Sequence, residues 1–358
     1  MPSLSLFLVG APRAGKTAVF DALTNTPQGP HFAAKGAHRL GTVKVPDVRL
    51  EGLRDLYQPK KYTPAEVTFV DVALPPPAAG QGNSFSQLNA FLSEADAFAI
   101  VIQAFGEMDY TGRPPDPARQ LESLLLELAV ADLEKVERRI EKIDQDAQRG
   151  LKGNEAERVV LDRCRKQLEA GRALRDLAFT IEEEKRISSF RFLSQKRVMV
   201  VANVAEQHLD GSGLDPLRAA AGAHQLEVLT FCAPLEAEIA TLEAGAQADF
   251  LKDYGISEPA RIRLIHSAYR LLDLISFFTV GPDEVRAWTI RRGTLAPQAA
   301  GKVHTDMERG FIRAETVVCD DLLRLKSHAA CREQNRLRLE GKTYVVQDGD
   351  VIEFRFSA

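Results

Sequence analysis

A glycine-rich motif close to the N-terminus constrains the fold of this chain more than any other feature. It follows an apolar run at 4–9, precedes a helical pattern at 18–23, and reads Gly10-Ala11-Pro12-Arg13-Ala14-Gly15-Lys16-Thr17. The glycines allow the backbone to curl, so that successive N–H groups and the start of the helix face a phosphate. Because this geometry needs a strand, a tight loop and a helix in that order, the motif predicts a P-loop in an α/β fold.

Two side chains of the motif and one downstream carboxylate carry the expected chemistry. We expect Lys16, the candidate catalytic residue, to neutralise the β- and γ-phosphate oxygens of a nucleotide, and the Thr17 hydroxyl to ligate Mg²⁺. Asp71 ends the apolar run at 67–70, where a P-loop protein holds the metal through water. The whole motif and Ala18 are candidate nucleotide-binding residues, and Thr17 and Asp71 are the candidate metal ligands. The competing interpretations are a glycine turn that binds nothing and a carboxylate that serves only as a cap.

Short apolar runs without alternating polarity indicate buried strands. Such runs, separated by helical patterns, are typical of a parallel sheet with helices on both faces. They occur at 4–9, 67–70, 98–105, 198–202 and 226–232. We therefore expect an α/β domain with a mostly parallel sheet.

A long helical pattern interrupts this alternation. It begins after Asp116-Pro117, an acidic N-cap followed by a proline at the first helical position. Gly150 and Gly153 break the pattern, and a second helix starts near Asn154. These signals predict an antiparallel helical hairpin inserted over about 116–196. A solvated structural arm without a partner is the simpler interpretation of the same helices.

The C-terminal residues change character again. Tyr344 and Val346 precede the turn dipeptide Asp348-Gly349, and apolar residues recur after it, which predicts a β hairpin in a small β-rich domain. The expected domain division is a nucleotide-binding domain at 1–115 and 197–275, the hairpin at 116–196 and a β-rich domain at 276–358.

Composition excludes several classes of protein. The formal net charge of −4 excludes a strongly basic protein that coats nucleic acid, although it permits a local basic patch. The four cysteines have no CxxC spacing and the seven histidines no HxxxH or HExxH spacing, so neither a disulfide framework nor a zinc site is indicated. No signal-peptide pattern and no stretch of 18 uncharged apolar residues is present. We expect a soluble cytoplasmic monomer with no membrane contact.

The residues at the end of the fourth predicted strand indicate which nucleotide base the site would prefer. Asn203-Val204-Ala205-Glu206 stands where translation-factor-like GTPases carry Asn-Lys-x-Asp. Their aspartate accepts from the N1–H and N2–H₂ groups of guanine, whereas Glu206 is one methylene longer and lacks the preceding lysine. A guanine preference is therefore not expected. The alternative interpretation is an Asn-x-x-Glu box at a helix start.

The order of these elements resembles one family across essentially the whole chain, and the likeness is densest in the C-terminal part. The strings that carry it are FFTVG at 277–281, RAWTI at 286–290, APQAAG at 296–301, HTD at 304–306, ERGFIRAE at 308–315 and YVVQDGD at 344–350. Together with the P-loop, Asp71, the hairpin and Asn203-x-x-Glu206, they resemble the YchF family of Obg-related P-loop ATPases and GTPases.

This resemblance implies an architecture and an activity. The architecture is a Ras-like nucleotide domain, a helical hairpin and a C-terminal TGS domain of β-grasp type. The activity implied is binding of ATP with Mg²⁺, with GTP as the alternative nucleotide and with Asn203, Val204 and Glu206 near the base. It also implies association with ribosomes through the hairpin and the TGS domain.

The chain departs from the family pattern at its expected switches. An ungapped count from Val45-Pro46-Asp47 places Lys35 where the family has a switch I threonine that completes magnesium coordination. Leu74, followed by three prolines, stands where a glycine N–H would meet the γ-phosphate. Cys232-Ala233-Pro234 replaces a Ser-Ala-Lys string near the base. We therefore expect a divergent member with slow hydrolysis.

Three functions are compatible with these features. The first is a nucleotide-dependent switch with weak P-loop ATPase activity. The second is a scaffold that binds nucleotide without hydrolysis. The third is a P-loop kinase that acts on a small acceptor, although such kinases need a lid with arginines and the insertion is instead predicted to be a long two-helix arm.

Overall fold

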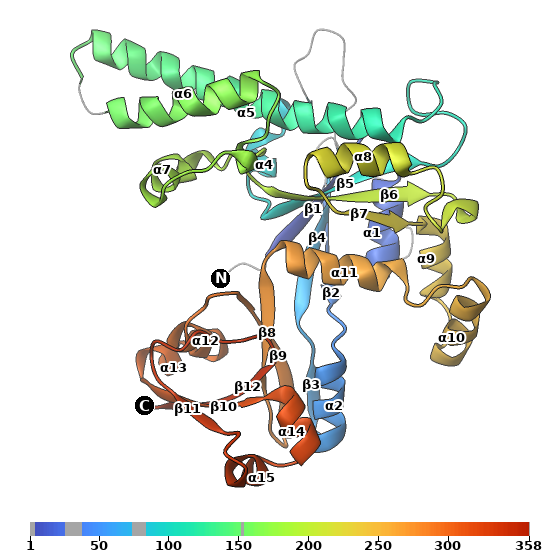
Figure 1. The fold of residues 1–358 in the computed structure, drawn as a ribbon, viewed down its shortest axis with the longest axis vertical. Coiled ribbons are helices and arrows are strands. Elements are labelled where there is room, and N and C mark those ends of the chain that lie inside the picture. Colours follow the sequence, from blue (N-terminus) through green and yellow to red (C-terminus); the bar gives the residue numbers. More distant parts are fainter. Residues whose placement is uncertain (1–3, 26–37, 74–83, 152–153, 358) are drawn as a thin grey trace. The chain divides into compact units, whose positions relative to one another are not determined.

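The computed structural model describes residues 4–25, 38–73, 84–151 and 154–357. The chain forms two compact units, one made of residues 1–41 and 68–261 and the other of 42–67 and 262–358. Strands β2 (Arg39–Lys44) and β4 (Glu66–Asp71) and helix α11 (Ala260–Leu271) each run from one unit into the other. Figure 1 shows the fold of each unit.

The first unit is built on a six-stranded sheet with the order β2-β4-β1-β5-β6-β7. Strand β1 pairs in parallel with β4 and β5, and β6 pairs in parallel with β5 and β7. The other strands are β1 (Ser5–Val9), β5 (Ala97–Ala104), β6 (Arg197–Val204) and β7 (Val228–Phe231). All five predicted apolar strands are confirmed.

Helices accompany the sheet of the first unit. They are α1 (Lys16–Thr24), α3 (Ser84–Gln87), α4 (Asn89–Leu92), α5 (Pro117–Gln148), α6 (Glu155–Glu169), α7 (Ile181–Ile187), α8 (Asp215–Ala223), α9 (Ala233–Ile239) and α10 (Ala244–Asp253), with short 3₁₀ turns at Leu174–Asp176, Ser188–Phe190 and Glu206–His208. Across the ranges that the structure covers, no helix is both long and apolar enough to cross a membrane.

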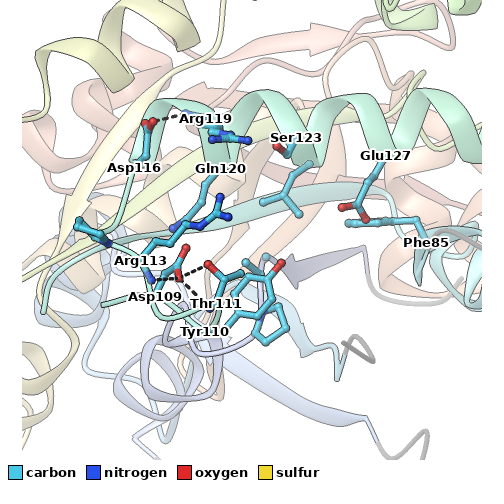
Figure 2. A pocket seen from close by; sticks show the side chains of 15 residues that line it. Phe85, Asp109, Tyr110, Thr111, Arg113, Asp116, Arg119, Gln120, Ser123 and Glu127 are labelled. Atoms are coloured by element: carbon cyan, nitrogen blue, oxygen red, sulfur yellow. Dashed lines mark hydrogen bonds between the residues drawn. The ribbon is translucent and has the colours of Figure 1, made fainter. Parts of the chain in front are cut away.

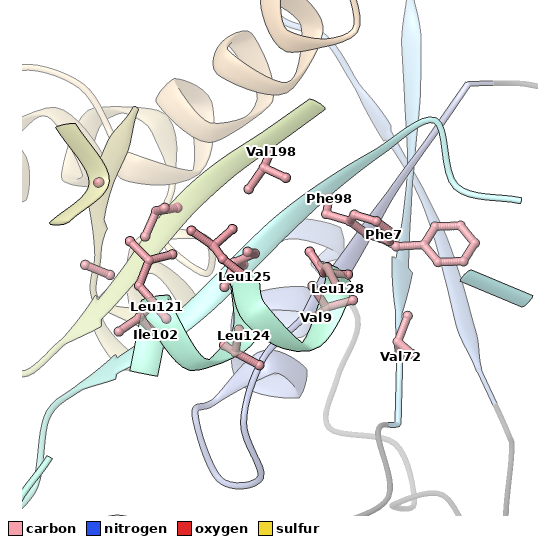
Figure 3. Packing of buried hydrophobic residues seen from close by; sticks show 14 of the residues in the cluster. Phe7, Val9, Val72, Phe98, Ile102, Leu121, Leu124, Leu125, Leu128 and Val198 are labelled. Atoms are coloured by element: carbon pink, nitrogen blue, oxygen red, sulfur yellow. The ribbon is translucent and has the colours of Figure 1, made fainter. Parts of the chain in front are cut away.

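The N-terminal half of α5 packs on the sheet. Its start is set by Asp116, whose carboxylate accepts the N–H of Arg119 at 3.0 Å, and by Pro117 in the first turn. Four leucines at helical spacing then enter the core beside residues of β1, β5 and β6 (Figure 3). They are Leu121, Leu124, Leu125 and Leu128. The helix is therefore part of the nucleotide domain's core before it enters the insertion.

The C-terminal half of α5 and helix α6 form the predicted hairpin. Val136, Ile140 and Ile143 of α5 share a separate core with Val160 and Leu161 of α6, and the core also contains residues that follow α6. Two bidentate ion pairs join the helices at their rims, between Arg139 and Glu157 and between Arg158 and Asp144. This second core gives the hairpin its own packing, which explains how it extends beyond the sheet.

Asp132 connects the two halves of α5 to the returning chain. Its side chain is fully buried and accepts the N–H groups of Leu193 at 2.8 Å and Ser194 at 2.6 Å, and the Ser194 hydroxyl at 2.7 Å. Burial raises the pKa of Asp132, and the three donors oppose that shift. A carboxylate buried at this depth is retained because all its contacts are donors.

The second unit contains another six-stranded sheet, with the order β11-β10-β12-β8-β9-β3. Its strands are β3 (Lys61–Thr63), β8 (Leu274–Thr279), β9 (Glu284–Arg291), β10 (Phe311–Val318), β11 (Arg338–Glu340) and β12 (Asp350–Phe356). Its helices, apart from α11, are α2 (Val48–Tyr57), α12 (Ala296–Val303), α13 (Thr305–Arg309), α14 (Cys319–Leu325) and α15 (His328–Glu333). Alanines of α12 pack on the apolar face of this sheet.

Residues 42–67 belong to this second unit, although the expected domain division placed them with the nucleotide domain. Strand β3 pairs in parallel with β9, so it extends the second sheet. In addition, Arg49 of α2 binds the Asp348 carboxylate at 2.9 Å. Strand pairing between distant segments therefore determines where this stretch folds.

The prediction of a β hairpin around Asp348-Gly349 is wrong. Only the run after the dipeptide is a strand, β12, and it pairs antiparallel with β10 and parallel with β8. The preceding residues form a turn, because the Asp350 carboxylate accepts the Tyr344 hydroxyl at 2.6 Å and the Gln347 N–H at 2.9 Å.

We expect Asp132→Ala to lower the free energy of unfolding by about 3 kcal/mol, because two buried N–H groups and a hydroxyl lose their acceptor. Chemical denaturation measures the change. Glu137→Ala, on the exposed face of the same helix, is the control and should stay within about 0.5 kcal/mol of the unsubstituted chain. Equal stabilities of the two variants would show that the Asp132 contacts are not structural.

Candidate functional site

The P-loop motif forms a tight turn between β1 and α1. Gly15 has a φ of +85° and is the N-cap of α1, and Arg13 has a φ of 61°. A Cβ atom on Gly10 would lie 2.3 Å from the Val101 carbonyl oxygen, and one on Gly15 would lie 2.2 Å from Nδ2 of Asn203. Both positions therefore require glycine. Gly10 does so because the β5 backbone is close, and Gly15 because of its positive φ and the nearby Asn203 side chain.

The Lys16 side chain folds back over the loop. Its Nζ donates to the carbonyl oxygens of Gly10 and Ala11, each at 2.9 Å. Burial lowers the pKa of Lys16 to about 8, and the nearby Asp71 carboxylate opposes that shift. The ammonium thus lies at the loop where the motif predicts phosphate oxygens.

Thr17 and Asp71 meet beside Lys16. The Thr17 hydroxyl donates to Oδ2 of Asp71 at 2.9 Å, while Oδ1 of this carboxylate is buried and accepts no hydrogen bond from the described residues. Burial raises the pKa of Asp71, opposed by the Thr17 hydrogen bond and by the charges of Lys16 and Arg39. A buried carboxylate oxygen without a partner, next to a hydroxyl, fits the oxygen ligands that Mg²⁺ prefers.

Two residues that follow the first expected switch, Arg39 and His38, lie near the Asp71 carboxylate. Arg39 binds Asp21 of α1 at 2.6 Å and lies over the Phe20 ring, 4.8 Å from its centroid. His38 stacks on Phe91 of α4 with the ring centroids 3.6 Å apart. No sequence motif pointed to these contacts, because each joins segments that are distant along the chain.

Asn203 connects the P-loop to the strand that carries the base motif. Its Nδ2 donates to the Ala14 carbonyl oxygen at 3.2 Å, and its Oδ1 accepts the Ala233 N–H at 3.3 Å. The side chain is 3% exposed, so both bonds form in a buried setting. The neighbouring Val204 side chain lies in the hydrophobic core of the sheet. Asn203 and Val204 are both predicted to lie near the nucleotide base. The Asn203 side chain is a buried link to the P-loop, and only the backbone of Val204 is left to contact a base.

Glu206 lies exposed just beyond β6 and has a partner that the sequence did not indicate. The Tyr254 hydroxyl donates to Oε1 of Glu206 at 2.6 Å, and the Tyr254 ring stacks on Phe250 with centroids 4.8 Å apart. The pair is 48 residues apart in the sequence. Neither periodicity nor a local motif could have detected it.

The structure brings together most of the predicted site. The motif, Asp71 and Asn203 are joined by direct contacts, and Ala18 lies in the first turns of α1. Lys35, Leu74 and the prolines 75–77 lie outside the described residues. Within the described ranges, no group of three or more His, Cys, Asp or Glu side chains is placed to hold a metal ion.

A pocket of about 270 Å³ lies beside the first residues of the P-loop (Figure 2). The N-terminal turns of α5 and the segment before that helix form its other walls. It is lined by Gly10, Ala11, Pro12, Phe85, Asp109, Tyr110, Thr111, Arg113, Pro114, Asp116, Arg119, Gln120, Ser123, Leu124 and Glu127. Apart from the motif residues Gly10, Ala11 and Pro12 and the N-cap Asp116, no sequence motif pointed to these lining residues.

Similarity to known proteins extends over the full chain. A Bacillus subtilis protein named ribosome-binding ATPase YchF is 38% identical over 372 residues, which cover 99% of this chain and all of that protein. This chain belongs to the YchF family. Proteins of the same name from Haemophilus ducreyi and Escherichia coli O157:H7 are 38% and 37% identical, each with 98% coverage of both chains.

Comparison with a solved YchF structure agrees with the sequence similarity. The solved structure of the Schizosaccharomyces pombe YchF GTPase covers 99% of both chains with a TM-score of 0.86 and 28% identity. Residues 274–357 match the family model YchF-GTPase_C, described as "Protein of unknown function (DUF933)". The resemblance to YchF and the expected fold class, an α/β nucleotide-domain fold with a helical insertion and a C-terminal β domain, are therefore confirmed.

We expect Asn203→Asp to lower the free energy of unfolding of this YchF protein by about 2 kcal/mol without nucleotide. The substitution removes the donor to Ala14 and turns a carboxylate oxygen toward that carbonyl in a buried setting. Denaturant titration measures the loss, and Asn335→Asp at an exposed position is the matched control. Identical midpoints for both variants would contradict the role of Asn203 as a link.

Proposed function

We propose that this chain is a nucleotide-dependent switch that binds ATP with Mg²⁺ through its P-loop and hydrolyses it slowly. The observation that carries the proposal is the contact between Thr17 and Asp71 beside the buried Lys16 ammonium. Its relatives in the YchF family are named ribosome-binding ATPases, which supports both the reaction and an association with ribosomes.

Lys16 supplies the positive charge of the phosphate site. Its two present partners are carbonyl oxygens, which are neutral acceptors. Phosphate oxygens carry charge and form stronger hydrogen bonds with an ammonium, so a nucleotide competes well for Lys16. The backbone N–H groups of the motif and of Ala18 complete the cradle at the N-terminus of α1.

Thr17 and Asp71 are the residues that would hold magnesium. Oδ1 of Asp71 has no partner among the described residues, and the Thr17 hydroxyl, which donates its hydrogen to Oδ2, keeps its oxygen lone pairs for the metal. When bound, magnesium neutralises charge on the β- and γ-phosphates. Asp71 is then stabilised as a carboxylate, against the burial that raises its pKa.

Glu206 favours adenine over guanine. Its carboxylate can accept from the 6-amino group of adenine, whereas it would repel the 6-oxo group of guanine. The Tyr254 hydroxyl occupies Oε1 and leaves Oε2 for the base. Asn203 positions the strand that leads to Glu206, and GTP remains the alternative nucleotide with weaker affinity.

The remaining parts of the chain supply contacts with the ribosome. We assign the nucleotide domain to 1–115 and 197–275, apart from residues 42–67 and 262–275, which fold with the second unit. We assign the hairpin to 116–196 and the TGS-like β domain to 276–358, and we propose a monomer that contacts the ribosome through these two parts. Hydrolysis is slow because Lys35 and Leu74 replace a switch hydroxyl and a switch glycine. A nucleotide change then alters these contacts through the switches.

We expect Lys16→Ala to weaken ATP binding at least 100-fold, about 2.7 kcal/mol, because the cation facing the phosphates is lost. Turnover should fall below detection, while the unfolding midpoint stays within a few degrees of that of the unsubstituted chain. Calorimetric titration with ATP and Mg²⁺ measures the affinity, and Lys142→Ala on the exposed face of α5 is the control. An unchanged dissociation constant in folded Lys16→Ala would refute the phosphate site.

We expect ATP to bind about tenfold more tightly than GTP, a difference of roughly 1.4 kcal/mol. Tyr254→Phe keeps the ring that stacks on Phe250 and removes only the hydroxyl that holds Glu206. The ratio of the two affinities should therefore fall several-fold, with little change in stability. Competition titrations with both nucleotides give the ratio. A tenfold preference for GTP in the unsubstituted chain would rule out adenine selection.

A further inference from the structure

We propose that the pocket between the first P-loop residues and α5 binds a small oxyanion of phosphate type. The donors come from Gln120 and Ser123 of α5 and from two arginines at the pocket wall, Arg113 and Arg119 (Figure 2). These groups are separate from Lys16 and Thr17, so the pocket is a second anion site beside the nucleotide cradle.

Gln120 presents a donor that has no acceptor. Its Oε1 accepts the backbone N–H of Gln103 at 3.1 Å, and because only the oxygen of the amide can accept, this bond determines which way the amide faces. Its Nε2 is buried and makes no hydrogen bond with the residues that the structure describes. A buried donor without a partner costs about 1–3 kcal/mol, which a bound acceptor would recover.

Two cations, Arg113 and Arg119, also line the pocket beside Gln120. Arg113 and Arg119 use their backbone N–H groups to bind the carboxylates of Asp109 and Asp116, at 3.1 and 3.0 Å. Both arginines are exposed, and the charge of Arg113 also helps to lower the pKa of Asp109. Arginine is the side chain best suited to bidentate binding of phosphate oxygens.

The carboxylates of the pocket are committed elsewhere. Asp109 accepts the N–H and the hydroxyl of Thr111, each at 2.7 Å, in addition to the Arg113 N–H. Asp116 caps α5. The donors of Gln120, Ser123, Arg113 and Arg119 are the groups of this pocket that an oxyanion can satisfy.

Two sources can supply this phosphate chemistry. Gly10, Ala11 and Pro12 form one wall, so the terminal phosphate of a nucleotide in the P-loop is one source and free inorganic phosphate is the other. The first source rests on the proposed function, whereas the second does not require any nucleotide.

Two pocket variants and one control test the site. Gln120→Glu keeps the acceptor for the Gln103 N–H and replaces the unpartnered NH₂ by a carboxylate oxygen, which repels an anion. The double variant Arg113→Gln/Arg119→Gln removes two charges from exposed side chains. Arg149→Gln/Arg172→Gln removes the same charge from exposed positions that do not line the pocket.

Binding of inorganic phosphate is measured by calorimetry in a Lys16→Ala background, where the cradle has lost its cation. We expect saturable binding that each pocket variant weakens at least tenfold and that the charge-matched control leaves unchanged. Affinities for ATP and ADP are measured in the same variants with Lys16 intact, and a loss for ATP alone identifies the terminal phosphate as the ligand.

A loss of phosphate affinity or a loss of ATP affinity in the pocket variants supports the proposal. Which of the two affinities falls identifies the source of the phosphate. If phosphate binding is absent in the Lys16→Ala background and both pocket variants bind ATP and ADP as the control does, the proposal is overturned. That outcome leaves the proposed nucleotide function intact, since that function depends on ATP binding through Lys16.

Discussion

Close backbone packing around the P-loop is the constraint on which the rest of the site depends. Gly10 lies against the Val101 carbonyl of β5, and Gly15 lies against the Asn203 amide, with no room for a Cβ atom at either position. Asn203 in turn binds Ala14 and Ala233. The central strands of the sheet therefore hold the loop from two sides, which orients its N–H groups before any ligand arrives.

The preorganised loop places charged groups in a buried setting. Lys16 and Asp71 both have pKa values shifted by burial toward their neutral forms, and each partly stabilises the charge of the other. Oδ1 of Asp71 has no hydrogen-bond partner among the residues that the structure describes, so these residues do not satisfy the cluster by themselves. A phosphate and a divalent cation would supply the missing charges, which is why nucleotide binding explains the geometry best.

Helix α5 links this site to the insertion. Its first turns line the pocket beside the P-loop and contribute leucines to the core of the sheet, and Gln120 binds the backbone of β5. Farther along, Asp132 holds the chain that returns from the hairpin, and the last turns pack on α6. One continuous helix thus lines the P-loop pocket at one end and packs in the hairpin core at the other.

The amino-acid sequence by itself determined the P-loop, the apolar strands and the two long helices, because each depends on a local motif or a periodic pattern. It also pointed to Thr17, Asp71 and Asn203, since strand ends in a parallel sheet converge at one edge. Only the tertiary structure decided the rest. The transfer of 42–67 to the second sheet, the turn at Tyr344 in place of a strand, and the pairs Tyr254–Glu206 and Gln103–Gln120 all join positions whose partners are selected by packing between separate elements. Such contacts leave no periodic or local signal, because their energy arises only when distant segments meet.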